Sequence, residues 1–159
     1  MSELTTLLVF LLDSQRYALP LEAVERTVRA AAITPLPQAP QIVLGVLDLR
    51  GTILPVLNVR RRFRLPERAI HPSDQFLIAR AGERPVALVI DAAAEVLELS
   101  PAQIVAGKAL VPGLEHVQGV ARMSDGLILI HDLETFLSLD EAAALDRAMS
   151  ANEEVLHGA

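Results

Sequence analysis

Hydrophobic residues in this chain occur in short runs separated by turn-forming residues, and this spacing predicts strands along most of its length. Gly, Pro, Asp or Ser stands between many of the runs. Ten short strands are typical of a barrel or a sandwich. The predicted strands are residues 7–12, 16–19, 27–30, 46–49, 53–57, 76–80, 86–90, 96–99, 117–123 and 127–131.

Turn sequences between the predicted strands indicate four hairpins. They lie at residues 13–15, 50–51, 81–83 and 124–126, and each contains a residue that tolerates the backbone angles of a tight turn. The sequence therefore predicts a mainly β fold with few, short helices.

Two serines carry the capping-box pattern that begins a helix. Ser100 stands three residues before Gln103, with proline at the first helical position, and Ser138 stands three residues before Glu141. The second box precedes an amphipathic segment, which predicts a C-terminal helix. We expect the tail at residues 151–159 to fray.

Two stretches of the sequence recur in the same order. Residues 17–30 align without gaps with residues 86–99, an offset of 69, and residues 45–51 align with residues 119–125, an offset of 74. We interpret this duplication as two similar β subdomains. Identities are few, so a chance match between two β-rich stretches is the alternative.

The duplication defines the expected domain organisation. We expect residues 1–150 to form one domain of two interlocked β subdomains, with duplicated segments at about 7–63 and 76–137. The second alignment continues far enough to pair Asn58 with Asp132. Each of these residues follows an apolar strand, so each is predicted to cap a short helix.

Length and composition restrict the class of protein. A chain of 159 residues has the usual size of one domain. The absence of cysteine excludes disulfides and thiolate zinc sites and fits a reducing cytoplasm. The first apolar run, residues 7–12, is far shorter than the roughly 18 residues that a membrane span needs, and no basic segment precedes it. We therefore expect neither direct membrane insertion nor a signal peptide.

The charge of the chain argues against nucleic-acid binding. The sequence has 14 basic and 20 acidic residues, a net charge of -6, whereas nucleic-acid binders are usually strongly basic. One local positive run is either a solvated helical face or a partner-binding patch; a nucleic-acid site built on it would show a steep salt dependence. The run consists of Arg60, Arg61, Arg62, Arg64 and Arg68.

Catalytic, cofactor-binding and metal-binding patterns are not found in the sequence. Gly107 and Lys108 lack the upstream glycine of a phosphate-binding loop, because Ala102 stands in its place. His131 and Asp132 have no partnered serine, and the other histidines, His71, His116 and His157, are not spaced as a helical metal pair. We therefore predict a protein that is not an enzyme. The alternative is a stand-alone small-ligand-binding or enzymatic β-barrel that uses the cleft between the subdomains.

The segment at residues 34–51 has the character of a recognition site. Its prolines stiffen the approach to a strand, and Gly51 is suited to a positive backbone angle in the turn that follows. Arg50 on so tight a turn presents a planar, permanently charged group that suits a partner's carboxylate. The alternative is that Arg50 pairs with an acid of its own fold.

The succession of these residues resembles the CheW-type coupling proteins of bacterial chemotaxis. The resemblance runs from Leu7 to Leu137 in the right order and spacing, and depends on the whole set rather than on one motif. The matching positions are Tyr17, Leu19, Val24, Thr34 to Pro37, Pro40, Gly45, Leu49, Arg50, Gly51, Pro55, Val56, Val89 to Val96, Gly119 and Leu127 to Leu137.

The resemblance implies two five-stranded SH3-like barrels packed together and a scaffold without activity or cofactor. Its implied partners are the cytoplasmic tip of a chemoreceptor and the regulatory domain of a CheA-type histidine kinase, which places the protein in the cytoplasm at receptor arrays. By position, the resemblance assigns Val24, Gly45, Arg50 and Gly51 to the surface that meets the receptor.

One departure from the family pattern concerns partner choice. Arg26 stands where the family often has an acidic residue, whereas Glu95 occupies the matching place of the second copy. Asp48, where the family often has asparagine, is a milder departure. Because a reversed charge alters electrostatic complementarity, we hypothesise that Arg26 adapts the protein to a specialised or secondary chemosensory system.

Overall fold

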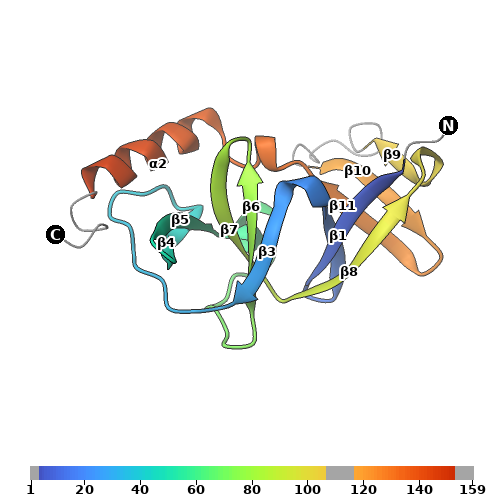
Figure 1. The fold of residues 1–159 in the computed structure, drawn as a ribbon, viewed down its shortest axis with the longest axis horizontal. Helices are drawn as coiled ribbons and strands as arrows, with labels where there is room; N and C mark the ends of the chain where they lie inside the picture. Colours follow the sequence, from blue (N-terminus) through green and yellow to red (C-terminus); the bar gives the residue numbers. More distant parts are fainter. Residues whose placement is uncertain (1–3, 107–116, 153–159) are drawn as a thin grey trace.

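The fold is mainly β and consists of two sheets, in a computed structural model that describes residues 4–106 and 117–152. Figure 1 shows the two sheets side by side along the long axis of the molecule. The first sheet has the order β8 (Ala92–Leu99), β1 (Thr5–Leu12), β2 (Gln15–Pro20), β11 (Gly126–His131), β10 (Val117–Met123), β9 (Ile104–Ala106). The second has the order β3 (Val24–Arg29), β6 (Gln75–Ala81), β7 (Arg84–Ile90), β5 (Thr52–Leu57), β4 (Val43–Leu49).

Helical elements are few among the described residues, as predicted. The longest is α2 (Leu139–Ala151), and no helix there is long and apolar enough to cross a membrane. Ser138 caps α2 through the predicted box, and the helix extends to Ala151. The others are α1 (Val59–Arg62) and the short 3-10 turns η1 (Leu21–Ala23), η2 (Pro101–Gln103) and η4 (Leu133–Thr135).

Each sheet encloses a core of its own, and a third cluster joins the two. Alternate side chains of the first sheet, such as Leu7 and Val9, pack with Ile128, while Phe76 and Val56 fill the second. The joining cluster takes buried side chains from both sheets and from α2. The predicted fold of two small packed β units is therefore confirmed, and the first sheet has a sixth strand, β9.

The two duplicated segments exchange strands. Strands β1 to β5 have their equivalents in β6, β7, β8, β10 and β11, yet β1 and β2 pair with strands of the second segment, and β6 and β7 with strands of the first. The parallel pair Val56↔Ala87 recurs as Ile130↔Ala18 under the two offsets.

Even the irregularities of the strand pairs repeat. The register shift between Val43 and Gly45 recurs between Val117 and Gly119. A chance match of composition does not explain such agreement, which reflects a duplicated fold.

Some strands are longer than the hydrophobic runs indicated. β3 begins at Val24 rather than at 27, and β8 at Ala92 rather than at 96, because pairing with a neighbouring strand overrides the weak strand preference of alanine and charged residues. β9 was not predicted; it corresponds to the single bridge between Thr34 and Val46 in the first copy. Residues Gly107, Lys108, His116 and 153–159 lie outside the described part of the chain.

Candidate partner-binding surface

The five residues assigned to a binding surface lie in two groups at opposite edges of the second sheet. Val24 and Arg26 are on β3, at one edge, and Gly45 is on β4, at the other. Arg50 and Gly51 form the turn between β4 and β5. Three strands separate the two groups, so the five residues do not lie on neighbouring strands.

β3 is an open edge with an irregular register. Val24 pairs with Ala79 and Arg26 with Ile78, so the register shifts between them. Such a bulge turns side chains away from the regular alternation. Val24 is half-buried against the core, whereas Arg26 is exposed and makes no ion pair within the described residues. Arg26 is therefore accessible to a partner.

The Arg50–Gly51 turn has the geometry that its sequence predicted. Gly51 has a φ of 90° and Arg50 a φ of 54°, and the Gly51 N–H donates to Asp48 Oδ1 at 2.8 Å. Arg50 is exposed, and no carboxylate in the described part of the chain forms an ion pair with it. The geometry therefore does not support the alternative that Arg50 pairs with an acid of its own fold. Asp48 accepts a hydrogen bond within the turn instead.

Gly45 is buried, because the chain crosses directly over it. A Cβ at this position would lie 2.5 Å from the Thr34 carbonyl oxygen, in the segment that bridges to Val46. At the equivalent Gly119, a Cβ would lie 3.1 Å from the Val105 carbonyl oxygen and 3.0 Å from the Ile104 side chain. Gly45 therefore shapes the edge of β4 and has no side chain to offer a partner.

Replacing Gly45 with alanine is expected to destabilise the protein by about 1–3 kcal/mol, the usual effect of overpacking, because the added methyl group meets backbone rather than a flexible side chain. Urea denaturation measures the change. The matched control is Gly82→Ala, where no atom lies within 4 Å and only the φ of +66° opposes the substitution. An equal or larger loss at Gly82 would show that close approach is not the reason for Gly45.

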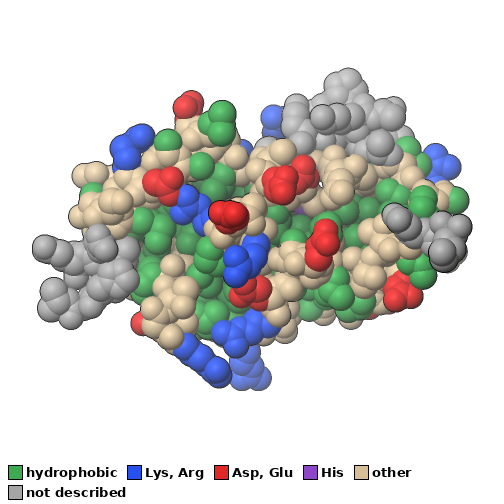
Figure 2. Space-filling view, turned by 45° about the horizontal axis from the view of Figure 1, so that its top comes forward, with side chains coloured by type: hydrophobic (Ala, Val, Ile, Leu, Met, Phe, Trp, Pro, Cys, Tyr) green, Lys and Arg blue, Asp and Glu red, His purple; other side chains and the backbone are tan. Residues whose placement is uncertain are grey.

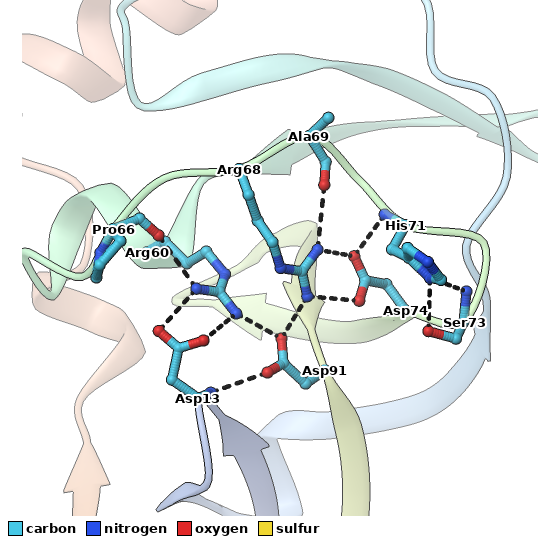
Figure 3. Close-up of polar contacts among 9 residues, drawn as sticks. All are labelled: Asp13, Arg60, Pro66, Arg68, Ala69, His71, Ser73, Asp74 and Asp91. Carbon is cyan, nitrogen blue, oxygen red and sulfur yellow. Dashed lines mark hydrogen bonds and ion pairs between the residues drawn. The ribbon is translucent and has the colours of Figure 1, made fainter.

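Four of the five arginines in the positive run at residues 60–68 form ion pairs within the fold, which corrects the prediction of a solvated face or a free patch; Arg64 has no ion pair among the described residues. Arg60 is 7% exposed and its guanidinium grips Asp13 with two contacts of 2.9 Å and Asp91 with one of 2.8 Å (Figure 3). Arg68 pairs with Asp74 and Asp91, each at 2.8 Å. We call Arg60, Arg68 and their three aspartate partners the first junction.

The first junction connects the two sheets. Asp13 lies in the turn between β1 and β2 of the first sheet, and Asp91 lies where the chain passes from β7 of the second sheet to β8 of the first. The hydrogen bond from Arg60 lowers the pKa of Asp13 below its ordinary value of 3.8. Figure 2 shows basic and acidic side chains intermingled across the middle of one face, as such pairing requires.

Two further arginines of the run are also paired. Arg62 contacts Glu141 of α2 at 2.5 Å, and Arg61 contacts Glu67 at 3.3 Å. The local sequence gave no signal of the Arg62 contact, because Glu141 stands 79 residues away.

Asp74 makes the stability of the first junction dependent on pH. It is 2% exposed, and hydrogen bonds from Arg68 and from the His71 N–H hold its pKa below the ordinary 3.8. Because the folded state holds the Asp74 carboxylate ionised more readily than the unfolded state does, Asp74 contributes to the free energy of unfolding above about pH 4. This contribution is lost as the pH falls through the pKa of Asp74 in the folded state.

We expect Arg68→Met to lower the free energy of unfolding at pH 7, because Asp74 loses its cation. The effect should become smaller below pH 4, where Asp74 is protonated, and urea titrations at several pH values measure it. Arg64→Met, at an exposed arginine without an ion pair among the described residues, is the control. A loss that stays constant from pH 7 to pH 2 would contradict the role of Asp74.

Asn58 and Asp132 cap short helices, as predicted. Asn58 Oδ1 accepts from the Arg61 N–H at 3.1 Å, and Asp132 Oδ1 accepts from the Glu134 N–H at 3.0 Å. His131 is buried and its ring stacks on Phe63, with centroids 3.8 Å apart. Packing and capping therefore account for the His131–Asp132 pair.

A hollow that the sequence did not indicate lies between η1, the β6–β7 turn and η4. Its volume is about 400 Å³, and acidic side chains, Glu22 and Glu134 among them, line it. No group of three potential metal ligands occurs in residues 4–106 and 117–152. Two packed β sheets with strands at open edges make this protein a β scaffold, a class in which sheet edges can serve to bind other proteins.

The chain belongs to the CheW-like domain family, whose sequence profile matches residues 6–141. It is 26% identical over 145 residues to a "Chemotaxis protein CheW" from Treponema pallidum, covering 87% of this chain and 85% of the relative. It is 31% identical over 121 residues to "Protein FrzA" from Myxococcus xanthus, covering 72% of each.

A solved structure has the same fold. The crystal structure of the scaffolding protein TtCheW from Thermoanaerobacter tengcongensis superposes with a TM-score of 0.79 at 25% identity, over 87% of this chain and 96% of that protein. The predicted resemblance to the CheW family is thereby confirmed.

Proposed function

We propose that this protein is a non-catalytic adaptor that couples the cytoplasmic tips of chemoreceptors to the regulatory domain of a CheA-type histidine kinase. It works in the cytoplasm, at receptor arrays of a bacterial chemosensory system. The observation that carries the proposal is the match of the CheW-like profile to residues 6–141, which spans both sheets. The relatives named for chemotaxis and scaffolding support the same function.

The exposed arginines supply the surface for such a role. Arg26 and Arg50 project from the second sheet, and neither is neutralised by an ion pair among the described residues. Val24 lies beside Arg26 on the open edge of β3 and offers apolar contact at the same place. We assign these residues, with the Gly51 turn and the strand edge shaped by Gly45, to partner binding.

A reconstitution tests the proposal. The purified protein is mixed with the histidine kinase and receptor membranes of the same cell, and co-sedimentation and kinase autophosphorylation are measured. The adaptor is expected to carry the kinase into the receptor pellet and to raise its autophosphorylation. Failure to form a ternary complex with any co-expressed receptor and kinase would overturn the proposal.

The rival function is a stand-alone ligand-binding or enzymatic β-barrel. The hollow beside η4 provides a volume of about 400 Å³ for a small molecule, but charged and polar side chains, such as Glu22, Arg80 and Glu134, line much of it. Ligand pockets of this size are usually lined mainly by apolar and aromatic side chains. The adaptor therefore accounts better for the exposed edges and the family match.

Arg26→Glu is expected to change partner choice. If Arg26 adapts the protein to a particular receptor, the reversed charge should strengthen binding to a standard receptor tip about fivefold and weaken binding to the cognate tip, since Arg26 has no internal ion pair to lose. Titration calorimetry with the two tips measures both. Glu95→Gln on the equivalent strand is the control, and equal affinities of Arg26 and Arg26→Glu proteins for the standard tip would contradict the idea.

A further inference from the structure

The duplicated fold contains a second junction, equivalent to the first, that is open. The offset of 69 carries Asp13 to Gly82 and carries Asp91 back to Glu22, and the offset of 74 carries Arg60 to Glu134. All three equivalents, Gly82, Glu22 and Glu134, line the hollow beside η4. We call this hollow the second junction.

The equivalence of the two junctions is structural as well as sequential. The β1–β2 hairpin has Asp13 in its turn and Glu22 after its second strand, and the β6–β7 hairpin has Gly82 and Asp91 in the same two places. The two hairpins pair in the same register, since Leu7↔Pro20 recurs as Phe76↔Val89. The caps also correspond, since Asn58 begins α1 and Asp132 begins η4. The same backbone arrangement therefore forms both junctions.

The first junction shows what this arrangement holds. There, the Arg60 guanidinium fills the space, gripping Asp13 and Asp91 and donating to the Pro66 carbonyl oxygen at 3.1 Å (Figure 3). Its side chain retains 9% of its exposure. A guanidinium among carboxylates and a carbonyl is well matched in geometry and charge.

The second junction keeps one of the two carboxylates that hold Arg60, as Glu22, and has a carboxylate, Glu134, at the position of the cation itself. Glu22 and Glu134 are exposed and form no ion pair with any described residue, and Asp132 adds a third carboxylate to the lining. Arg80 is the basic residue of the lining, and its Nε donates to Glu25 at 3.0 Å, so its charge is offset from within β3. The hollow therefore carries excess negative charge.

We propose that the second junction binds an arginine side chain of a partner protein, which takes the place that Arg60 occupies in the first. In naming the chemistry of a partner, this inference rests on the proposed adaptor function. The partner's guanidinium pairs with Glu22 and Glu134, and the wall at Gly82, which lacks the aspartate found at the equivalent turn, leaves room for the arriving chain. Neither Arg26 nor Arg50 lines this hollow, and its charge is opposite to theirs.

The probe for this site is N-acetyl-arginine amide, titrated into the full-length protein and followed by two-dimensional amide NMR. Saturable shifts are expected at Glu22, Gly82, Gln118 and Glu134. N-acetyl-citrulline amide, which has the same shape without the charge, should bind about tenfold more weakly. Glu22→Gln and Glu134→Gln should each weaken arginine binding severalfold, and Glu95→Gln, on β8, should leave it unchanged.

Glu134→Arg provides a second, independent test. It places a guanidinium at the position equivalent to Arg60, so it should abolish binding of the arginine probe while the thermal midpoint stays the same or rises. Equal shifts with citrulline, shifts scattered over the surface, or undiminished binding by Glu134→Arg would overturn the proposal. If the arginine probe binds but no ternary complex forms with receptor and kinase, the second junction stands and the adaptor function fails; the opposite result overturns only the second junction.

Discussion

Replacement of Arg60 by alanine is expected to lower the free energy of unfolding by about 2–3 kcal/mol, because it removes a buried guanidinium that hydrogen-bonds to Asp13 and Asp91, although Asp91 keeps its contact with Arg68. In a domain of this size the loss corresponds to a fall in thermal midpoint of roughly 7 °C. The Arg60 side chain is 9% exposed, and it pairs with one aspartate in a turn of the first sheet and with one in the connection between the two sheets, so water cannot easily replace it.

Urea denaturation at pH 7 measures this effect, and Arg61→Ala is the matched control. Arg61 is 42% exposed and contacts Glu67 at 3.3 Å, so its loss should cost less than about 1 kcal/mol. Equal losses for the two variants would mean that the first junction does not hold the sheets together.

Arg50→Glu is expected to weaken partner binding about a hundredfold and to leave the thermal midpoint nearly unchanged. The turn stays formed, since Gly51 still donates to Asp48, while a carboxylate replaces the cation that a partner's acid would meet. Because Arg50 has no ion pair within the described residues, the folded protein loses no ion pair on substitution.

Binding is measured by co-sedimentation with receptor and kinase, and Arg64→Glu is the control. Arg64 is likewise exposed, has a positive φ of 60° and forms no ion pair among the described residues, but lies outside the proposed surface. A large fall in the midpoint of Arg50→Glu would instead indicate a structural role for this arginine.

The features that sequence predicted well are those that depend on neighbouring residues. Turns at Gly51, Gly82 and Gly126 have the positive φ that a tight hairpin requires, and Ser138 with Glu141 begins a helix through contacts three residues apart. The duplication was also readable, because buried strands keep their spacing even when identities are few.

The features that sequence missed depend on residues far apart in the chain. Arg60 pairs with Asp13 and Asp91, which stand 47 and 31 residues away, and nothing within the local sequence distinguishes such an arginine from one in solvent. Gly45 was assigned to a surface, but its small size serves the crossing of Thr34, which only the folded chain brings there. The offset of 74 pairs Arg60 with Glu134, but this equivalence has a meaning only once the fold shows that both positions face the same kind of junction.

The exchange of strands between the duplicated segments determines when the protein can fold. The first sheet joins Ala18 to Ile130 and the second joins Val56 to Ala87, so a nascent chain that ends before β10 and β11 leaves β2 without its parallel neighbour. Contacts at such separations slow folding, since a long loop must close before they form. The two halves, separated in the loop after Arg64, should each remain unfolded alone and recover the native sheets only when mixed.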